Sequence, residues 1–323
     1  MTRRTLKKIL SSLLFALCLL QLGSVWIPRA VSIKGRQYRN IAGIASAVNM
    51  RSRRIGKFFI CSGASRNLRL ELSHRRMYWN GMTVMLGYPV LLHNGGIYVS
   101  ESDWQSTLKI LFFPASVPRH PIGVITLDAG HGGNDQGAAG KYSLEKSITL
   151  KLTQRVAALL RACRYRVHLT RSSDTAVALK TRTAMQRARK SDLFVSIHVN
   201  AAKNKKAHGI ETYCLTPAHA PSTNGKFELK RNPANRFDSN NFALARNLQY
   251  AMLVRTGAWD RGVKRARFAV LRDITSPGVL LEIGFISNPA EERKLNNPAY
   301  LEKLARGIAQ GIIAYHRDLR PRR

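Results

Sequence analysis

The sequence predicts an α/β protein: a mostly parallel, twisted sheet with helices on both faces, preceded by a small β-rich module. From Gly123 onward, short apolar segments alternate with longer segments whose apolar residues recur every three or four positions. That rhythm is typical of strand–helix–strand units and of a parallel sheet. Between residues 57 and 116, short apolar runs are instead separated by turn signals such as Asn80-Gly81, which is typical of antiparallel hairpins.

Composition indicates a folded chain. The 323 residues are 45% apolar and 22% charged, values that exclude disorder over the whole length, a collagen-like repeat and a disulfide-dense mini-protein. At about 150 residues per domain, this length predicts about two domains. The four cysteines form no C-x-x-C pair, so they imply neither a disulfide framework nor a cysteine-zinc knuckle.

Charge is the unusual quantity. The chain has 53 Lys and Arg against 18 Asp and Glu, a net charge of +35, and residues 1–121 contain 18 of the basic residues but only three of the acids. Such an excess predicts a polyanionic partner, which could be nucleic acid, an anionic envelope surface or an acidic cell-wall polymer. Because no binding motif with interleaved aromatic residues is present, we expect no specific nucleic-acid partner.

Residues 1–27 are predicted to be a signal peptide or a membrane anchor. Four basic residues within the first eight precede a mostly apolar run from Ile9 to Ile27, which is the pattern of a secretory signal. No good small-x-small cleavage site follows, so an uncleaved anchor stays open. We therefore expect an exported protein, located in the periplasm or cell envelope, where envelope polymers are the available polyanions.

Two further segments precede the α/β part. Residues 28–56 are basic and polar with little periodicity, which predicts a linker, and residues 57–116 are predicted to be a small β-rich accessory domain. The segment RRMYWNGMTVMLGYPVLLHNGGIYVSESDWQSTLKILFFP within it resembles the copper amine oxidase N-terminal-like domain. No histidine cluster accompanies it, so no copper is implied. Its role, positioning on the cell wall or spacing from the membrane, stays open.

The α/β part is expected over residues 122–316. A stretch rich in Pro, Asn, Ser and Gly interrupts its alternation at Thr216–Asn240, which predicts a surface loop. The expected strands are Val124–Leu127, Arg166–Leu169, Leu193–Ile197, Gly209–Leu215 and Val279–Ile283, and the expected helices are Glu145–Ala162, Leu179–Arg189, Asn241–Arg255 and Pro298–His316.

Three polar residues are expected at the edge where α/β sheets bind ligands. His131 follows the first strand within LDAGHGGNDQG, His198 ends the third strand, and Glu145 begins the first helix. Each has an ordinary structural explanation: a glycine-rich turn can bind phosphate, and a strand-end histidine or a helix N-terminal acid is common. Together, however, two imidazoles and one carboxylate suit a catalytic Zn²⁺ with a position left open for water.

A fourth candidate is Glu282, in the apolar strand sequence VLLEIGF. A buried carboxylate is costly unless it is paired or functional. It could form an ion pair with one of the many arginines. Beside a metal-bound water, it could instead be the general base, a role that needs a carboxylate with a perturbed pKa.

The part of the sequence that contains these residues resembles the zinc-dependent N-acetylmuramoyl-L-alanine amidases of the amidase_3 family. The similarity covers about residues 122–316 and includes the start of the Glu145 helix. It implies that zinc is held by His131, Glu145 and His198, that Glu282 is catalytic, and that Asn200 lies beside the zinc and orients a ligand or substrate. It rests on the segments VITLDAGHGGNDQGA, RVHLTRSSDT, ARKSDLFVSIHVNAA, HGIETYCL, RGVKRARFAVLR and VLLEIGFISNPAEERKL.

This resemblance implies a peptidoglycan hydrolase that cleaves the amide between the lactyl group of N-acetylmuramic acid and L-alanine of the stem peptide. Two alternatives remain: a non-catalytic peptidoglycan-binding protein, and another zinc hydrolase acting on peptidoglycan. The stretch 216–240 is not the long occluding helix of the divisome-regulated members, so we do not expect autoinhibition of that kind. An interaction with a protein activator stays open.

Overall fold

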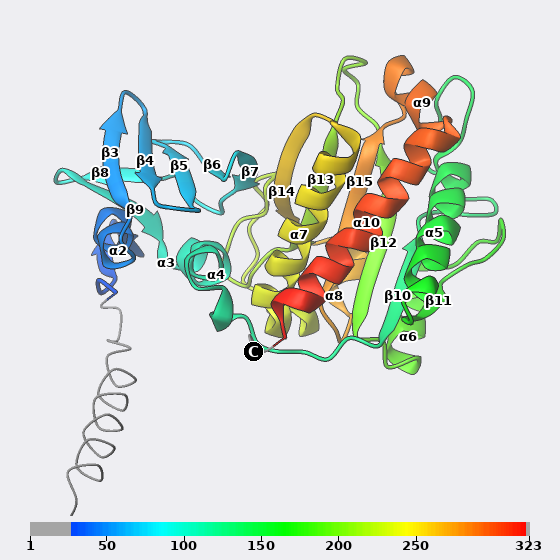
Figure 1. Ribbon diagram of the computed structural model, residues 1–323, viewed down its shortest axis with the longest axis horizontal. Helices are drawn as coiled ribbons and strands as arrows, with labels where there is room; N and C mark the ends of the chain where they lie inside the picture. The colour runs from blue at the N-terminus through cyan, green and yellow to red at the C-terminus, as the bar shows by residue number, and fades with distance from the viewer. Residues whose placement is uncertain (1–26, 321–323) are drawn as a thin grey trace, which may run out of the picture.

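The structure is a computed structural model that describes residues 27–320. The predicted signal peptide or membrane anchor therefore lies, except for Ile27, outside the described residues. Within the described part, no helix has both the length and the apolar character needed to cross a membrane. The predicted architecture is confirmed: a large sheet is flanked by helices, and a β-rich module precedes it (Figure 1).

Six strands form the α/β part of the sheet. In spatial order they are β11 (Arg166–Leu169), β10 (Val124–Ala129), β12 (Leu193–Asn200), β15 (Gly278–Phe285), β13 (Ile210–Leu215) and β14 (Asp260–Ala266). The first four strands are mutually parallel, β13 is antiparallel to β15, and β14 is parallel to β13. The carboxyl ends of β10, β12 and β15 therefore share one edge with the amino ends of β13 and β14.

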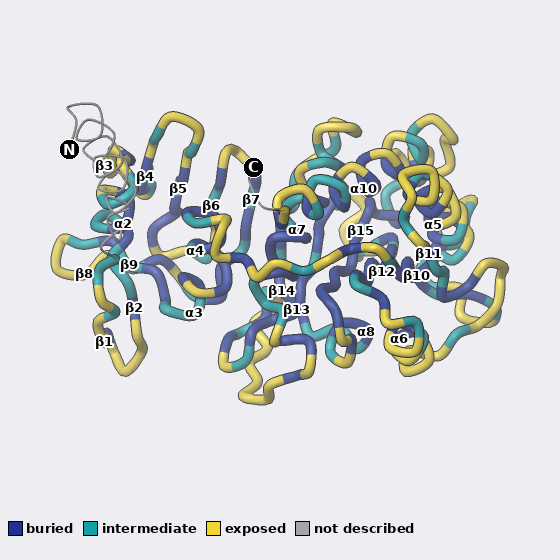
Figure 2. The backbone as a smooth tube through the Cα atoms, turned by 60° about the horizontal axis from the view of Figure 1, so that its bottom comes forward, coloured by how far each residue is buried: buried dark blue, intermediate teal, exposed yellow. Residues whose placement is uncertain are grey.

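Helices cover both faces of this sheet, as Figure 2 shows. Long helices pack together on one face, and shorter ones lie on the other. The helix predicted over Glu145–Ala162 has the same bounds in the structure. The long helices are α5 (Glu145–Ala162), α7 (Asp238–Thr256) and α10 (Pro298–Asp318). The shorter ones on the other face are α6 (Leu179–Ala188), α8 (Ala269–Arg272) and the 3-10 helix η3 (Pro233–Phe237). Helix α9 (Pro289–Leu295) follows β15.

The N-terminal module, residues 27–117, contains a four-stranded sheet and a five-stranded antiparallel meander. The small sheet has the order β1 (Val31–Ile33), β2 (Arg36–Asn40), β9 (Gly96–Ser100) and β8 (Leu91–His93). The meander comprises β3 (Arg51–Ile55), β4 (Phe58–Ser62), β5 (Asn67–Glu71), β6 (Arg76–Trp79) and β7 (Met82–Met85). The module also contains helix α2 (Ile41–Ala47) and one continuous helical segment. That segment comprises α3 (Glu101–Asp103), the π-helical turn η1 (Trp104–Leu108), α4 (Lys109–Phe112) and the 3-10 turn η2 (Pro114–Ser116).

The module is continuous with the α/β part. Strand β7 pairs with β14 through Val84 and Val263, so the meander extends the sheet of the α/β part into a single sheet of eleven strands. The two parts also share one hydrophobic core, which includes Trp104 and Phe112 of the module together with Phe242 of α7. The module is therefore packed onto the edge of the α/β part.

The prediction of a linker over residues 28–56 is wrong. This segment contains β1, β2, α2 and β3, and several of its apolar side chains, including Tyr38, Ile41 and Ile44, are buried. The sequence shows little periodicity here because all five residues of β3 are exposed, which leaves no alternation of buried and exposed positions to detect. The predicted loop 216–240 is irregular only as far as Asn232, after which η3 and α7 begin.

Candidate metal centre and catalytic site

The structure brings His131, Glu145 and His198 together at the carboxyl edge of β10 and β12. His131 Nε2 lies 3.2 Å, and His198 Nδ1 3.0 Å, from the same oxygen, Glu145 Oε1. One ligand atom from each of the three residues lies within 4.8 Å of the other two. The three side chains come from a loop, a helix start and a strand end that are far apart in the chain, so only the folded sheet assembles them.

Glycines in the loop after β10 make room for this cluster. His131 itself has a left-handed backbone conformation, with φ of +62°, which turns its ring back over the sheet edge. A Cβ atom at Gly130 would lie 2.4 Å from Cε1 of His198, and one at Gly137 would lie 2.7 Å from Oε2 of Glu145. Residues with side chains at these two positions would therefore displace the candidate ligands.

The spacing of the three donors fits zinc. Two ligand atoms bound tetrahedrally at about 2.0–2.1 Å from Zn²⁺ lie about 3.3 Å apart, close to the two nitrogen–oxygen distances found here. Neutral imidazole and carboxylate are ligands that Zn²⁺ prefers. Three protein ligands leave one tetrahedral position for water or substrate, as in catalytic rather than structural sites.

Local electrostatics favour binding of a cation. Although burial acts to raise it, hydrogen bonds with His131 and His198 hold the pKa of Glu145 well below its usual value. Its two oxygens also accept hydrogen bonds from the backbone, Oε1 from Val199 N at 2.9 Å and Oε2 from Ala138 N at 2.8 Å. Glu145 is therefore a fixed carboxylate at neutral pH, which is the protonation state that a metal requires.

Asp135 is a further candidate site residue, which the sequence analysis did not single out. Both of its carboxylate oxygens lie 2.9 Å from Nδ1 of His131, so this ring nitrogen donates to Asp135 and Nε2 is left to face Glu145. A carboxylate in this position fixes the orientation of a metal-binding imidazole and increases its basicity. The available signal was an acid four residues after His131 in a chain that has few acids.

Replacing Asp135 with asparagine is expected to weaken zinc binding by about 10- to 100-fold, because the His131 ring loses its charged partner. Zinc affinity can be measured by competition with a chromophoric chelator. The matched control is Asp192→Asn, since Asp192 accepts hydrogen bonds from the backbone at the opposite edge of the sheet. Equal affinities for the two variants would contradict the role of Asp135.

Glu282 lies beside the candidate metal ligands. It is in register with His198 of β12 and with Glu211 of β13, so the three side chains project from the same face of the sheet. Its Oε2 atom is buried and has no hydrogen-bond partner among the described residues. Burial, together with the neighbouring carboxylates Glu145 and Glu211, raises the pKa of Glu282 well above its usual value.

A partnerless carboxyl group of this kind is typical of a catalytic acid or base. The alternative considered above was an ion pair between Glu282 and an arginine. Among residues 27–320, no arginine nitrogen lies within 4.0 Å of a carboxylate oxygen of Glu282, although other acids of the site do form such pairs. Glu282 lies three residues before the end of β15.

Asn200 lies at the end of β12, and its amide bonds to residues other than the three candidate ligands. Its Nδ2 donates to Glu211 Oε1 at 2.5 Å, and its Oδ1 accepts from Ala201 N at 2.7 Å. Glu211, which the sequence analysis did not single out, also forms ion pairs with Arg261 and Lys264 of β14. Asn200 is thus part of a charged network next to Glu282.

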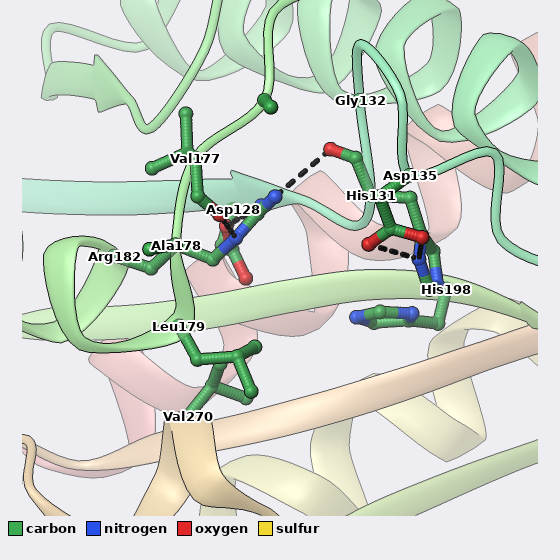
Figure 3. Close-up of a pocket in the computed structure, with 11 residues that line it drawn as sticks. Asp128, His131, Gly132, Asp135, Val177, Ala178, Leu179, Arg182, His198 and Val270 are labelled. Atoms are coloured by element: carbon green, nitrogen blue, oxygen red, sulfur yellow. Dashed lines mark hydrogen bonds and ion pairs between the residues drawn. The ribbon is translucent and has the colours of Figure 1, made fainter.

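A pocket of about 320 Å³ opens beside the cluster. Figure 3 shows His131 and His198 at one end and the apolar side chains of Leu179 and Val270 at the other. Beneath it, the buried Arg182 donates to Asp128 Oδ1 at 2.6 Å and to the carbonyl oxygen of His131 at 2.8 Å. This arginine therefore fixes the backbone of the loop that carries His131.

Fold and site together define an α/β protein with a candidate metal centre at the carboxyl edge of its sheet. The family model of the N-acetylmuramoyl-L-alanine amidases, Amidase_3, matches residues 125–314. The chain therefore belongs to the Amidase_3 family. The match begins after the N-terminal module, whose resemblance to the copper amine oxidase N-terminal-like domain stays a prediction.

Individual relatives agree with this assignment. The chain is 35% identical over 193 residues to the N-acetylmuramoyl-L-alanine amidase LytC of Bacillus subtilis, an alignment that covers 60% of this chain and 35% of LytC. It is 33% identical over 221 residues to the N-acetylmuramoyl-L-alanine amidase AmiC of Escherichia coli, covering 60% of this chain and 53% of AmiC. The chain thus spans about a third to a half of these relatives.

A solved structure shows the same fold. The catalytic domain of CwlV, an N-acetylmuramoyl-L-alanine amidase from Bacillus (Paenibacillus) polymyxa var. colistinus, superimposes with a TM-score of 0.52 at 34% sequence identity. The superposition covers 60% of this chain and 98% of the CwlV chain. The α/β part therefore matches nearly the whole CwlV chain in fold.

Proposed function

We propose that this protein is a zinc-dependent N-acetylmuramoyl-L-alanine amidase, a peptidoglycan hydrolase that cleaves the amide between the lactyl group of N-acetylmuramic acid and L-alanine of the stem peptide. The observation that carries this proposal is the convergence of His131, Glu145 and His198 beside the partnerless carboxyl group of Glu282. Membership of the Amidase_3 family supports the substrate class and the bond cleaved.

In this proposal His131, Glu145 and His198 hold the zinc. When bound, zinc supplies Lewis acidity at this point, which polarises a carbonyl and lowers the pKa of water from 15.7 to about 7. Asp135 keeps the His131 ring in the required orientation, and Arg182 holds the loop beneath it. The adjoining pocket, which has His131 and His198 at one end, accommodates substrate groups on one side of the scissile amide.

Glu282 moves the proton in the reaction that we propose. As a carboxylate it accepts a proton from the attacking water, and as a carboxylic acid it returns that proton to the leaving amine of L-alanine. A raised pKa suits both steps, because a group that titrates closer to neutral pH accepts and releases a proton readily. Its Oε2 atom has no hydrogen-bond partner among the described residues, so no other group of the protein competes for this proton acceptor.

A muropeptide digest tests the function. Purified sacculi are incubated with the protein, with and without a zinc chelator, and the products are analysed by mass spectrometry. We expect free stem peptides beginning with L-alanine, and no release when the chelator is present. A non-catalytic peptidoglycan-binding protein would release nothing in either case, while a carboxypeptidase or a deacetylase would release D-alanine or acetate instead, and either result would reject the amidase.

We also propose that the protein acts in the periplasm or cell envelope, since its substrate lies there and residues 1–27 have the pattern of an export signal or membrane anchor. The basic N-terminal module suits attraction to an anionic envelope component. The three acids of the module, Glu71, Glu101 and Asp103, already have partners within it, and they pair with few of its many cations, namely Lys57, Arg76 and Arg39. Strand β3 presents several of these, including Arg51 and Arg53.

Reversing the charge of Arg51 and Arg53 together, both to glutamate, is expected to weaken retention on isolated sacculi at low ionic strength. The difference should vanish near 1 M salt, where the Debye length falls to about 3 Å. The matched control reverses Lys303 and Arg317, two exposed residues of α10, which changes the net charge equally. Equal losses for the two double variants would mean that overall charge, rather than the module surface, governs binding.

A further inference from the structure

Strand β14 is the strand of the α/β part that borders the N-terminal module. On one side it pairs with β13, and on the other it meets β7 through Val263 and Val84. The backbone N–H of Thr83 donates to Asp260 Oδ2 at 2.6 Å. Gly262 has a φ of +88°, and a Cβ atom there would lie 2.8 Å from the carbonyl oxygen of Thr83, so the two strands approach as closely as a glycine allows.

Arg265 of β14 extends into the module. It is buried, and its Nη2 donates to the carbonyl oxygen of Ser106 and to Oγ1 of Thr107, both at 2.7 Å. Ser106 and Thr107 belong to the π-helical turn η1. Because a buried guanidinium without partners is costly, these contacts fix the position of β14 relative to the module.

The same strand carries two cations that pair with Glu211, the cross-strand neighbour of Glu282. Lys264 and Arg261 both form ion pairs with Glu211 of β13. Glu211 is in register with Gly262 on one side and with Glu282 on the other. Two carboxyl groups therefore stand next to each other in a largely buried site, and Lys264 and Arg261 neutralise one of them.

This neutralisation matters for the geometry of the site. Two neighbouring buried carboxylates repel each other strongly unless one is protonated or paired. If the β14 cations moved, the negative charge of Glu211 would act on Glu282 without compensation, and one of the two side chains would rotate away. Asn200, which donates to Glu211, would lose its partner in the same event.

We propose that the N-terminal module positions the catalytic glutamate: by holding β14 through β7 and Arg265, it keeps Lys264 and Arg261 against Glu211, and thereby keeps Glu211 and Glu282 side by side. Arg265 is a positioning residue, since it acts through β14 and touches no reacting atom. This inference rests on the proposed amidase function, and it gives the module a role within the active site beyond attachment to a surface.

The test is a double-mutant cycle between the module contact and Glu211. In the full-length protein, Arg265→Met is expected to lower kcat by about tenfold or more, with KM and bound zinc little changed. In a Glu211→Gln background, the same substitution should cost less than about twofold, because a neutral side chain no longer needs the β14 cations. Thr83→Pro removes the backbone donor to Asp260 and should behave in the same way.

The matched control is Arg39→Met, which breaks a partly buried ion pair with Glu101 inside the module without touching β14; its kcat should stay that of the wild type. Equal losses of kcat in both backgrounds, for Arg265→Met and for Thr83→Pro, would overturn the inference. If Arg265→Met does not fold, Thr83→Pro alone decides.

Hydrogen exchange provides a readout that does not depend on activity. We expect faster exchange in β14 and at residues 210–212 of β13 in Arg265→Met and in Thr83→Pro, but not in Arg39→Met. Unchanged exchange would overturn the inference. An inactive wild type with the expected exchange pattern would reject the amidase function alone, while an active wild type with an additive cycle would reject only the positioning role.

Discussion

Replacing Glu282 with glutamine is expected to lower turnover by about 10²–10⁴-fold while zinc stays bound. Glutamine has nearly the same shape but cannot take up a proton, and general acid–base catalysis contributes about 10²–10⁴-fold to rate. Glu282 is not one of the three residues that converge on the candidate metal position, so zinc content should stay that of the wild type. Stem-peptide release measures the rate, and metal analysis of the purified variant measures the zinc.

Glu302→Gln is the matched control for this variant, because Glu302 pairs with Arg155 and Arg306 at the surface of α10, and its rate should be unchanged. Turnover by Glu282→Gln near the wild-type rate would reject the assignment of the base. The raised pKa of Glu282 also predicts an acid limb: activity falls as pH drops through that pKa, because the protonated form cannot accept a proton. This limb should disappear from the residual activity of Glu282→Gln.

His131→Ala and His198→Ala are each expected to lose zinc and activity together. Either change leaves two protein ligands, fewer than the three of known catalytic zinc sites. Zinc per chain and stem-peptide release should fall in parallel after dialysis. The matched control is His316→Ala, since His316 bonds to Tyr165 away from the site. A variant of either ligand that kept one zinc per chain would refute the proposed coordination.

Much of the α/β part could be predicted from the sequence, because its buried strands and amphipathic helices carry clear periodicities. The helix that begins at Glu145 and the strands that lead to His131 and His198 are of this kind. Residues that end such elements at one edge of a sheet must meet there, so sequence order alone indicated which side chains come together.

Other features gave no such signal. Strand β14 was not predicted because its buried positions include the charged Arg265, whereas a pattern search expects apolar residues there. Arg182 and Glu211 are likewise buried charged residues whose partners come from distant segments. The strands of residues 28–56 escaped prediction for the opposite reason, since they expose most of their side chains. Only tertiary contacts reveal either group.

The eleven-stranded sheet also limits how this chain can be shortened. Removing the module by truncation before β10 would also remove β7, the neighbour of β14. Strand β14 would then be an exposed edge strand, which can pair with another copy of the chain. Arg265 would lose its acceptors in η1 at the same cut. The α/β part therefore depends on the module to cover β14 and to bind Arg265. Exchange of this module for another during evolution would require compensating changes along β14.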